Sequence, residues 1–345
     1  MGLFKWFVAA VLALFVMSGA GAQQVVLKLG MQIDQPDSAW ADIIKPWMDG
    51  ITAQSDGRIR FDMMPVASVE EAAGLYVKLR DGELDVLWAQ TGLDPKRFKR
   101  TEVFELPFMM PNPEAASRAL WEYVETYAVD EFKDVRLLGL HVKGASLFHT
   151  RERPIDSLAD LKGMRLRGGN RMTDQFLKQL GAEFMGPQLA ADPANGQPEP
   201  ERQADGYVCD WASAVRLAPS GQFQFHTGFG TTGALATSSY MLAINPKTYE
   251  SLPEELRRIL DANSGMETSA AFGRRAQRIS SIARDRVGAS DGYGSIRTLP
   301  LEEAQAFRKA AVKVEQAWVA EVSDKGFEGQ TLLDGARTLI KKYTR

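Results

Sequence analysis

Short apolar segments alternate with helix-forming segments in the first third of the chain. Val25–Met31, Ile59–Met64 and Leu84–Trp88 have the length and apolar character of buried strands. Helices are expected at residues 38–55 and from the capping box Ser68–Glu71 to residue 82. A β-α-β-α-β order of this kind predicts a parallel sheet covered by helices, and therefore an α/β fold.

The same alternation returns in the middle of the chain. Further strands are expected at Arg136–Val142, Met164–Arg167, Asp205–Val208 and Tyr240–Ile244, and a helix at Asn170–Leu180. Because no low-complexity linker separates the two clusters, we expect two interleaved α/β domains. We place domain I at 23–147 and about 237–275, domain II at 148–236 and about 276–325, and a C-terminal helix at 326–345.

The C-terminal third is expected to be mostly helical. The predicted helices are a long one at Leu252–Val287, and two more at Leu301–Ser323 and Gln330–Lys342. An irregular, proline-rich stretch at residues 189–203 interrupts the region before them.

Residues 1–22 have the pattern of a cleavable secretory signal. Lys5 provides the positive charge, Trp6–Met17 is almost wholly apolar, and Ser18–Ala22 ends in small residues before Gln23. The apolar run is shorter than the roughly 20 residues of a membrane-spanning helix. We therefore expect an exported, soluble mature protein in the periplasm.

The composition argues against several classes of function. The 345-residue chain carries a net charge of −3, which disfavours a nucleic-acid partner. Its single cysteine, Cys209, cannot form an internal disulfide, and its three histidines do not stand in a metal-ligand spacing. No nucleophile elbow or phosphate loop is present, and Gly228–Gly233 is better interpreted as a plain loop. We expect no catalysis, no cofactor and no bound metal.

Arg167 is the best candidate for binding a ligand. It ends a predicted strand and is followed by Gly168-Gly169-Asn170 and a helix. Ligands of open α/β sheets bind beyond the carboxyl ends of strands, and a guanidinium fits a carboxylate through two parallel hydrogen bonds. The helix N-terminus behind it would also favour an anion. The alternative is a surface arginine that pairs with a nearby acid.

Two further clusters could line a pocket. Tyr207 and Trp211 follow a strand and could stack on a planar ligand, whereas the alternative places both rings in the core. Trp88, Gln90 and Thr91 end the third strand, where the two polar side chains could contact a ligand and Trp88 could equally be core.

Another candidate is the apolar Phe104–Phe108 segment. Phe108 could form a pocket wall, or the segment could be a packed crossover. Asn170, directly after the two glycines, is a further candidate hydrogen-bond partner of a ligand.

Across nearly all of the mature sequence, the chain resembles the DctP-type solute-binding proteins of tripartite ATP-independent periplasmic (TRAP) transporters. The matching stretches, in order, are Asp56–Ile59, Gly82–Val86, Phe104–Phe108, Arg153–Ile155, Leu158–Arg167, Leu180–Ala182, Asp205–Gly206, Asn245–Pro246 and Ser251–Pro253. The resemblance implies two α/β domains of the type II periplasmic binding-protein kind, with a ligand cleft between them and a long bracing helix. It also assigns the carboxylate-binding role to Arg167.

Three departures from the family pattern bear on the ligand. The segment Gly144–Thr150 lacks the second arginine of many members, which argues against a sialic acid. Cys209 stands where the family usually has an asparagine. The tryptophan five residues after the Asp205-Gly206 pair, Trp211, is instead similar to that of a family branch in which this tryptophan lines the pocket. Ala212 replaces the acidic residue of metal-assisted members, and Pro193–Pro200 replaces a helix.

We therefore expect a monomeric binding protein that captures a small carboxylate, aromatic or branched, and delivers it to a TRAP membrane permease. One rival is a periplasmic sensor that presents the same fold to a receptor. A second rival, from another class, is a secreted α/β enzyme.

Overall fold

The computed structural model describes residues 24–32, 40–66, 69–185, 204–217, 222–230, 233–289 and 291–344. The predicted signal segment, the Ser68 cap and the proline-rich segment 193–200 lie outside these ranges. Within them, no helix combines the length and the apolar character that crossing a membrane requires.

The first sheet contains the three strands predicted from the N-terminal alternation. Its order is β2 (Ile59–Val66), β1 (Val25–Gln32), β3 (Val86–Gln90), β10 (Ser239–Ile244) and β4 (Arg136–Val142). β1 pairs in parallel with β2 and β3, as expected, whereas β10 is antiparallel to both β3 and β4. The sheet is therefore mixed, because a strand from the later half of the chain crosses into it.

The second sheet is built almost entirely from the middle of the chain. Its order is β11 (Ser295–Thr298), β9 (Phe225–Gly228), β5 (Leu147–Thr150), β8 (Gly206–Cys209), β6 (Arg165–Gly168) and β7 (Glu183–Phe184). The predicted α/β class with two interleaved units is confirmed, since β10 lies between strands of the first sheet although it follows β9 of the second in sequence.

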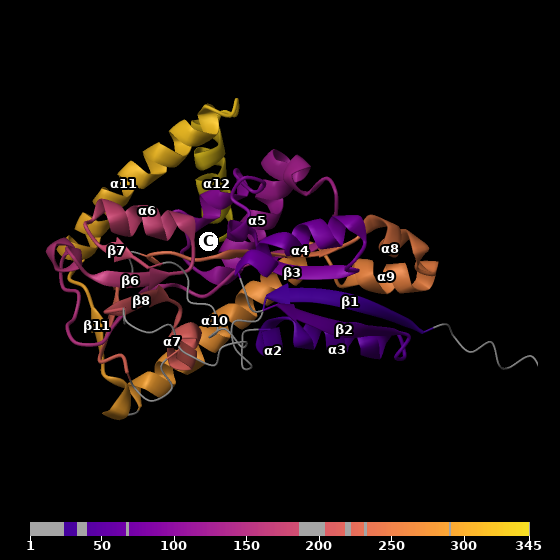
Figure 1. Cartoon of the computed structure of the whole chain (residues 1–345), viewed down its shortest axis with the longest axis horizontal. Coiled ribbons are helices and arrows are strands. Elements are labelled where there is room, and N and C mark those ends of the chain that lie inside the picture. Colours follow the sequence, from indigo (N-terminus) through magenta and orange to yellow (C-terminus); the bar gives the residue numbers. More distant parts are fainter. Residues whose placement is uncertain are drawn as a thin grey trace, which may run out of the picture.

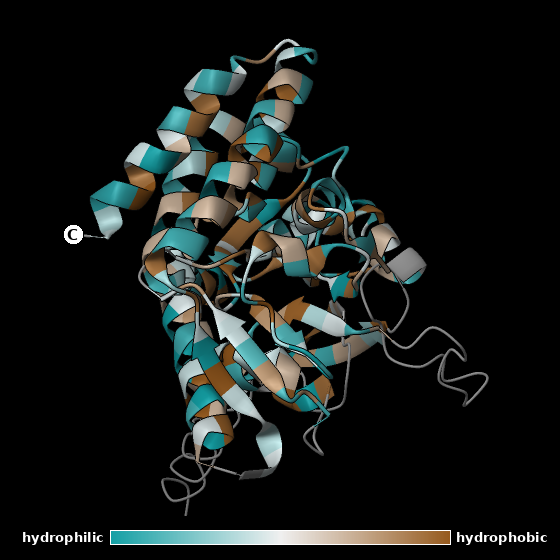
Figure 2. Ribbon diagram, turned by 90° about the vertical axis from the view of Figure 1, so that its left-hand side faces the viewer, coloured by the Kyte–Doolittle hydropathy of each residue, from teal (hydrophilic) through white to brown (hydrophobic). Residues whose placement is uncertain are grey.

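Helices surround both sheets (Figure 1). Those formed by the first half of the chain are α2 (Trp40–Ile43), α3 (Lys45–Gln54), α4 (Val69–Asp81) and α5 (Pro113–Tyr123). The later ones are α6 (Arg171–Gln179), α7 (Trp211–Leu217), α8 (Pro246–Ser251), α9 (Glu254–Ala262), α10 (Met266–Gly288), α11 (Leu301–Ser323) and α12 (Gly329–Tyr343). In Figure 2 brown and teal alternate along α11 and α12, as expected of helices with one face on the core.

Two predicted helices are each divided in the structure. The helix expected at 38–55 is interrupted at Ile44, one residue after α2 and two before Pro46. Proline has no N–H to donate within a helix and its ring clashes with the preceding turn. The single long helix expected at Leu252–Val287 is wrong: α9 ends at Ala262, and Gly265, with φ of 88°, caps α10.

α10 still acts as the brace between the sheets. It packs on α5 and β4 beside the first sheet and on α7 beside the second. α11 runs from the neighbourhood of α6 to α12, which packs on α5. Near the C-terminal end of α11, the fully buried Trp318 donates from Nε1 to the carbonyl of Lys99, 3.2 Å away.

Candidate ligand-binding site

Arg167 lies near the carboxyl end of β6, as the sequence predicts. Its side chain is half-buried, and Nη1 donates to the carbonyl of Met185 at 3.1 Å. Across the parallel pairing with β8 it stands opposite Tyr207, so both side chains point to the same face of the sheet. His149 of β5 occupies the next place in this row, opposite Tyr207.

Arg165, two residues before Arg167 on the same strand, pairs with an acid. Arg165 donates from its backbone N–H and from Nη2 to Asp205, with both distances 2.8 Å. Asp205 therefore orders the start of β8. The next residue, Gly206, must be a glycine because the backbone of β5 passes close to it: a Cβ there would lie 2.5 Å from the carbonyl oxygen of His149. The Asp205-Gly206 pair is thus explained by the packing of β8 between β5 and β6.

The ends of β3 and β6 meet through polar contacts. Gln90 Nε2 donates to the carbonyl of Gly169 at 2.9 Å. The side chain of Asn170 accepts from Thr173 N–H at 2.8 Å, which caps α6, and donates from Nδ2 to the carbonyl of Thr237 at 2.7 Å. The segment that follows Arg167 is therefore tied to the first sheet at two adjacent residues.

Thr91 belongs to a buried polar group behind this contact. Its hydroxyl lies 2.6 Å from that of Ser239, and Ser239 donates to Glu105 from both its backbone N–H (2.9 Å) and its hydroxyl (2.8 Å). Glu105 is fully buried, and this burial raises its pKa to about 8. At neutral pH the carboxyl group is therefore mainly protonated. Sequence reasoning missed Glu105, although a carboxylate inside an apolar run was a visible signal.

Trp88 lies in a stack of aromatic rings in the first sheet. Its ring centroid is 5.2 Å from that of Tyr240 and 6.0 Å from that of His141, to which Nε1 donates at 2.9 Å. Burial lowers the pKa of His141 to about 4, so the neutral imidazole can accept this bond. With 3% of its surface exposed, Trp88 has the environment of a core residue.

Aromatic rings also gather beside Arg167 in the second sheet. Tyr207 packs edge-on against Phe223 at 5.2 Å, and burial raises its pKa. Trp211, the first residue of α7, lies edge-on to His149 at 5.2 Å, and both Tyr207 and Trp211 are 8% exposed. The structure therefore brings Tyr207 close to Arg167 and places Trp211 farther along the same sheet face.

Cys209 and Phe108 occupy different surroundings. Cys209 ends β8 with a half-buried side chain, and burial raises the pKa of its thiol, which therefore stays neutral. Phe108 adopts a positive φ of 62° and packs edge-on against Phe229 at 5.2 Å and Phe176 at 6.3 Å. Because those rings belong to the region of the second sheet, Phe108 forms a packed contact between the two units.

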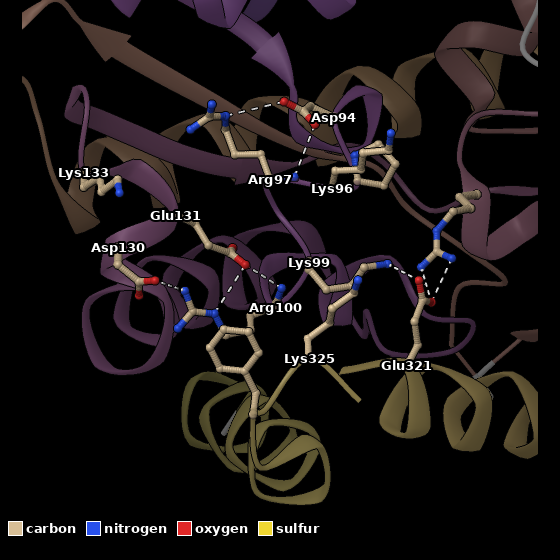
Figure 3. A pocket seen from close by; sticks show the side chains of 13 residues that line it. Asp94, Lys96, Arg97, Lys99, Arg100, Asp130, Glu131, Lys133, Glu321 and Lys325 are labelled. Atoms are coloured by element: carbon tan, nitrogen blue, oxygen red, sulfur yellow. Dashed lines mark hydrogen bonds and ion pairs between the residues drawn. The ribbon is translucent and has the colours of Figure 1, made fainter. Parts of the chain in front are cut away.

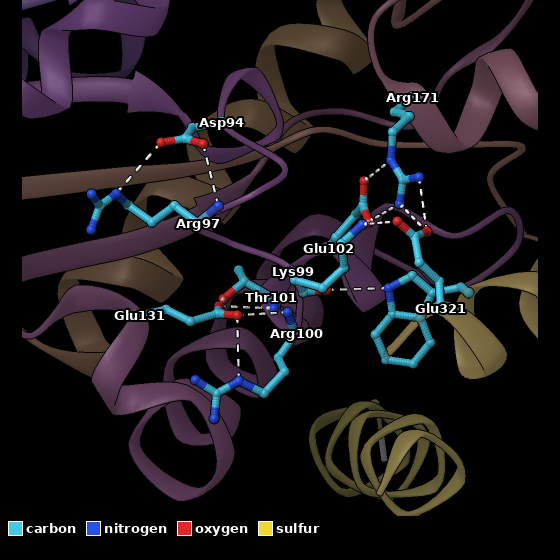
Figure 4. A network of polar contacts seen from close by, with 10 residues as sticks. Asp94, Arg97, Lys99, Arg100, Thr101, Glu102, Glu131, Arg171 and Glu321 are labelled. Carbon is cyan, nitrogen blue, oxygen red and sulfur yellow. Dashed lines mark hydrogen bonds and ion pairs between the residues drawn. The ribbon is translucent and has the colours of Figure 1, made fainter. Parts of the chain in front are cut away.

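An ionic network ties the first turn of α6 to the first sheet's side of the molecule (Figure 4). Arg171 donates to Glu102 at 2.7 Å and to Glu321 of α11 at 2.9 Å, and Lys99 donates to Glu321 at 2.7 Å. Burial opposes the charge of Arg171, but the hydrogen bonds and charges of Glu102 and Glu321 outweigh it and raise its pKa. Sequence reasoning missed this network because its members lie far apart along the chain.

Comparisons with known proteins identify the family to which this chain belongs. Residues 30–185 match the family model described as bacterial extracellular solute-binding protein, family 7 (DctP). The chain is 39% identical to a TRAP solute-binding protein of Rhodoferax ferrireducens solved with copurified benzoate, covering 93% of this chain and 99% of that one, with a TM-score of 0.83.

Two other solved structures are similar over nearly their whole length. A marine metagenome TRAP solute-binding protein, solved with 3-hydroxybenzoate, is 31% identical, with coverage of 94% and 100% and a TM-score of 0.85. A protein of Bordetella bronchiseptica, solved with (R)- and (S)-mandelate, is 26% identical, with coverage of 92% and 99% and a TM-score of 0.77. With its two sheets, its bracing helix and these relatives, the chain belongs to the DctP-type TRAP solute-binding proteins.

Proposed function

We propose that this protein binds a small aromatic carboxylate between its two sheets and delivers it unchanged to a TRAP membrane permease. Arg167 would grip the carboxylate through its planar fork, because this side chain is half-buried at the carboxyl end of a strand. This placement is the observation that carries the proposal.

The aromatic part of the ligand would lie against the rings near Arg167. Tyr207 shares its sheet face and register, and Trp211 lies along the same face. Three similar solved proteins hold benzoate, 3-hydroxybenzoate or mandelate, each of which joins one aromatic ring to one carboxylate. Gln90, Asn170 and Cys209 are proposed to complete the lining when the two units close, since Gln90 already reaches Gly169 across the junction. Trp88, Thr91 and Phe108, which are buried, would support this lining from behind.

The protein would act as a monomer in the periplasm after removal of residues 1–22. The sequence of that segment supports export, and the solved relatives are described as TRAP or periplasmic solute-binding proteins. We further propose that the two domains have the boundaries predicted above, centred on the two sheets.

Isothermal titration of the mature protein with three matched compounds tests this function. Benzoate carries both features, cyclohexanecarboxylate keeps the charge without the aromatic ring, and benzamide keeps the ring without the charge. We expect benzoate to bind most tightly and benzamide not to bind, because the half-buried guanidinium would be left without its anion. Equal binding of benzamide and benzoate would contradict the proposal, as would the absence of any heat with benzoate and its hydroxylated analogues.

A further inference from the structure

A groove of about 910 Å³ opens at the junction of the two units, beside the end of α11 (Figure 3). Its walls come from residues 94–100, from the short 3-10 helix Val129–Phe132 with Lys133, from the first residue of α6, and from residues 321–327. The groove is thus lined by segments from both units, as well as by the helix that joins them.

The lining has an excess of positive charge. Seven of its side chains are cationic and four are carboxylates, although the whole chain has a net charge of −3. A concave surface of one dominant sign concentrates the electrostatic potential and attracts groups of the opposite sign. The groove therefore favours an anionic occupant.

The excess charge lies on the rim of the groove. Other charges of the lining are paired within the protein: Lys99 with Glu321 at 2.7 Å and Arg100 with Asp130 at 2.6 Å. The rim lysines, Lys96, Lys133 and Lys325, are exposed, and none forms an ion pair with another residue in the described ranges. Their charge remains available to a partner.

The lining of the groove also combines an aromatic ring with an arginine. Phe327 is 36% exposed, and the guanidinium of Arg100 lies 4.4 Å from its ring centroid. Aromatic residues and arginine are enriched at the centres of protein interfaces, while lysine is more common at the rim. A concave surface with this lining fits a protruding protein segment better than a flat lipid surface.

We propose that this groove is the docking surface for an acidic segment of the membrane permease. The inference rests on the proposed function, because it assumes a carrier that delivers its ligand to that partner. Arg171 links Glu102 and Glu321 across the junction at the edge of the groove, so a segment seated there contacts both units at once. The permease could thereby distinguish different arrangements of the two units.

Titration with a short, fluorescent polyglutamate peptide tests the docking surface. The full mature chain is compared with a groove variant (Lys96→Glu, Lys133→Glu, Lys325→Glu) and with a control variant that reverses three exposed lysines elsewhere (Lys28→Glu, Lys162→Glu, Lys313→Glu). We expect the groove variant to bind the peptide about tenfold more weakly than the control variant, and the binding to weaken as salt is added.

Equal weakening in the two variants would overturn the proposal, because it would show attraction by net charge alone. Phosphatidylglycerol vesicles provide a second arm: binding to vesicles through the three rim lysines, with peptide binding unaffected by their reversal, would assign the surface to lipid and also overturn it. Benzoate titration is run in parallel on both variants and should be unchanged. If the wild type fails to bind benzoate, the proposed function is wrong. The peptide titration of the unliganded protein still tests whether the groove binds an acidic segment.

Discussion

Arg167 and Arg171 stand on either side of the segment Gly168-Gly169-Asn170, at the end of β6 and at the start of α6. Arg171 donates to two carboxylates, Glu102 and Glu321, which neutralise it within the protein. Arg167 is half-buried, donates to the main-chain carbonyl of Met185, and shares its sheet face with Tyr207. In the proposed function, Arg171 holds the segment in place and Arg167, because of its position on this face, binds the carboxylate of the ligand.

Two acids near these regions, Glu105 and Glu321, have pKa values shifted in opposite directions. The largest effect of this difference is expected in how stability depends on pH. Burial raises the pKa of Glu105 to about 8, so the folded protein retains a proton that the unfolded chain releases near its ordinary pKa of 4.5. The contribution of Glu105 to stability is therefore present below about pH 4.5 and falls as the pH rises through about 8, by several kcal/mol. For Glu321, burial opposes ionisation, but Lys99 and Arg171 lower its pKa, so its contribution is lost in the opposite direction, as the pH falls.

Denaturant unfolding of the wild type and of Glu105→Gln at several pH values measures this difference. The amide can accept the bonds from Ser239 but does not titrate. We expect the stability of the wild type to decline relative to the variant as the pH rises from about 5 to about 8. Parallel profiles would show that Glu105 does not retain a proton.

The ionic network should account for the next largest effect. Arg171→Met leaves Glu102, whose side chain is 2% exposed, without its closest charge partner, and should lower the free energy of unfolding by about 3 kcal/mol. The matched control is Arg165→Met, whose partner Asp205 is more exposed and whose loss should remain below about 1 kcal/mol. Equal losses in urea unfolding would remove the distinction between a locking arginine and an ordinary surface pair.

Replacing Asn170 separates helix capping from support of the ligand site. Asn170→Ala removes the cap of α6 and the bond to Thr237, whereas Asn112→Ala removes only the comparable cap of α5. Each variant should lose about 1 kcal/mol of stability. Only Asn170→Ala should also weaken benzoate binding in calorimetry, and the same loss of affinity in Asn112→Ala would contradict a local role.

The smallest effect is expected at Gln90. Its hydrogen bond to Gly169 spans the junction but is exposed to solvent, so Gln90→Ala should cost about 0.5 kcal/mol of stability. Gln54→Ala, which removes an exposed side-chain contact to Asn263 within the first unit, is the matched control. We expect only the Gln90 variant to change benzoate affinity, by a small factor in the same titration. Unchanged affinity would show that the hydrogen bond between Gln90 and Gly169 does not contribute to ligand binding.

Local patterns were sufficient to predict most of the fold. The β-α-β-α-β order predicted β1 to β3 and their parallel pairing, which the structure confirms. The insertion of β10 between β3 and β4 could not be predicted in this way, because it depends on pairing between strands more than 90 residues apart. The break at Gly265 was also missed, since helical periodicity continues on both sides of it.

The candidate site shows the same limit. The position of Arg167 after a strand and before two glycines could be read from the sequence, because strand and helix signals are local. The environment of Trp88 could not, since its hydrogen bond to His141 joins residues of different strands. The partners of Arg171 were equally hidden, because Glu321 lies 150 residues away in the sequence.

The most direct test of the account compares benzoate titrations of Arg167→Ala and Arg171→Met. Removing one partner of a desolvated charge pair costs roughly 2–5 kcal/mol, so Arg167→Ala should bind benzoate about 100-fold more weakly than the wild type or not at all, with its unfolding unchanged. Arg171→Met should be less stable yet retain measurable affinity at a temperature where it is folded. Wild-type affinity in Arg167→Ala, together with loss of binding in folded Arg171→Met, would show that the roles of the two arginines have been reversed.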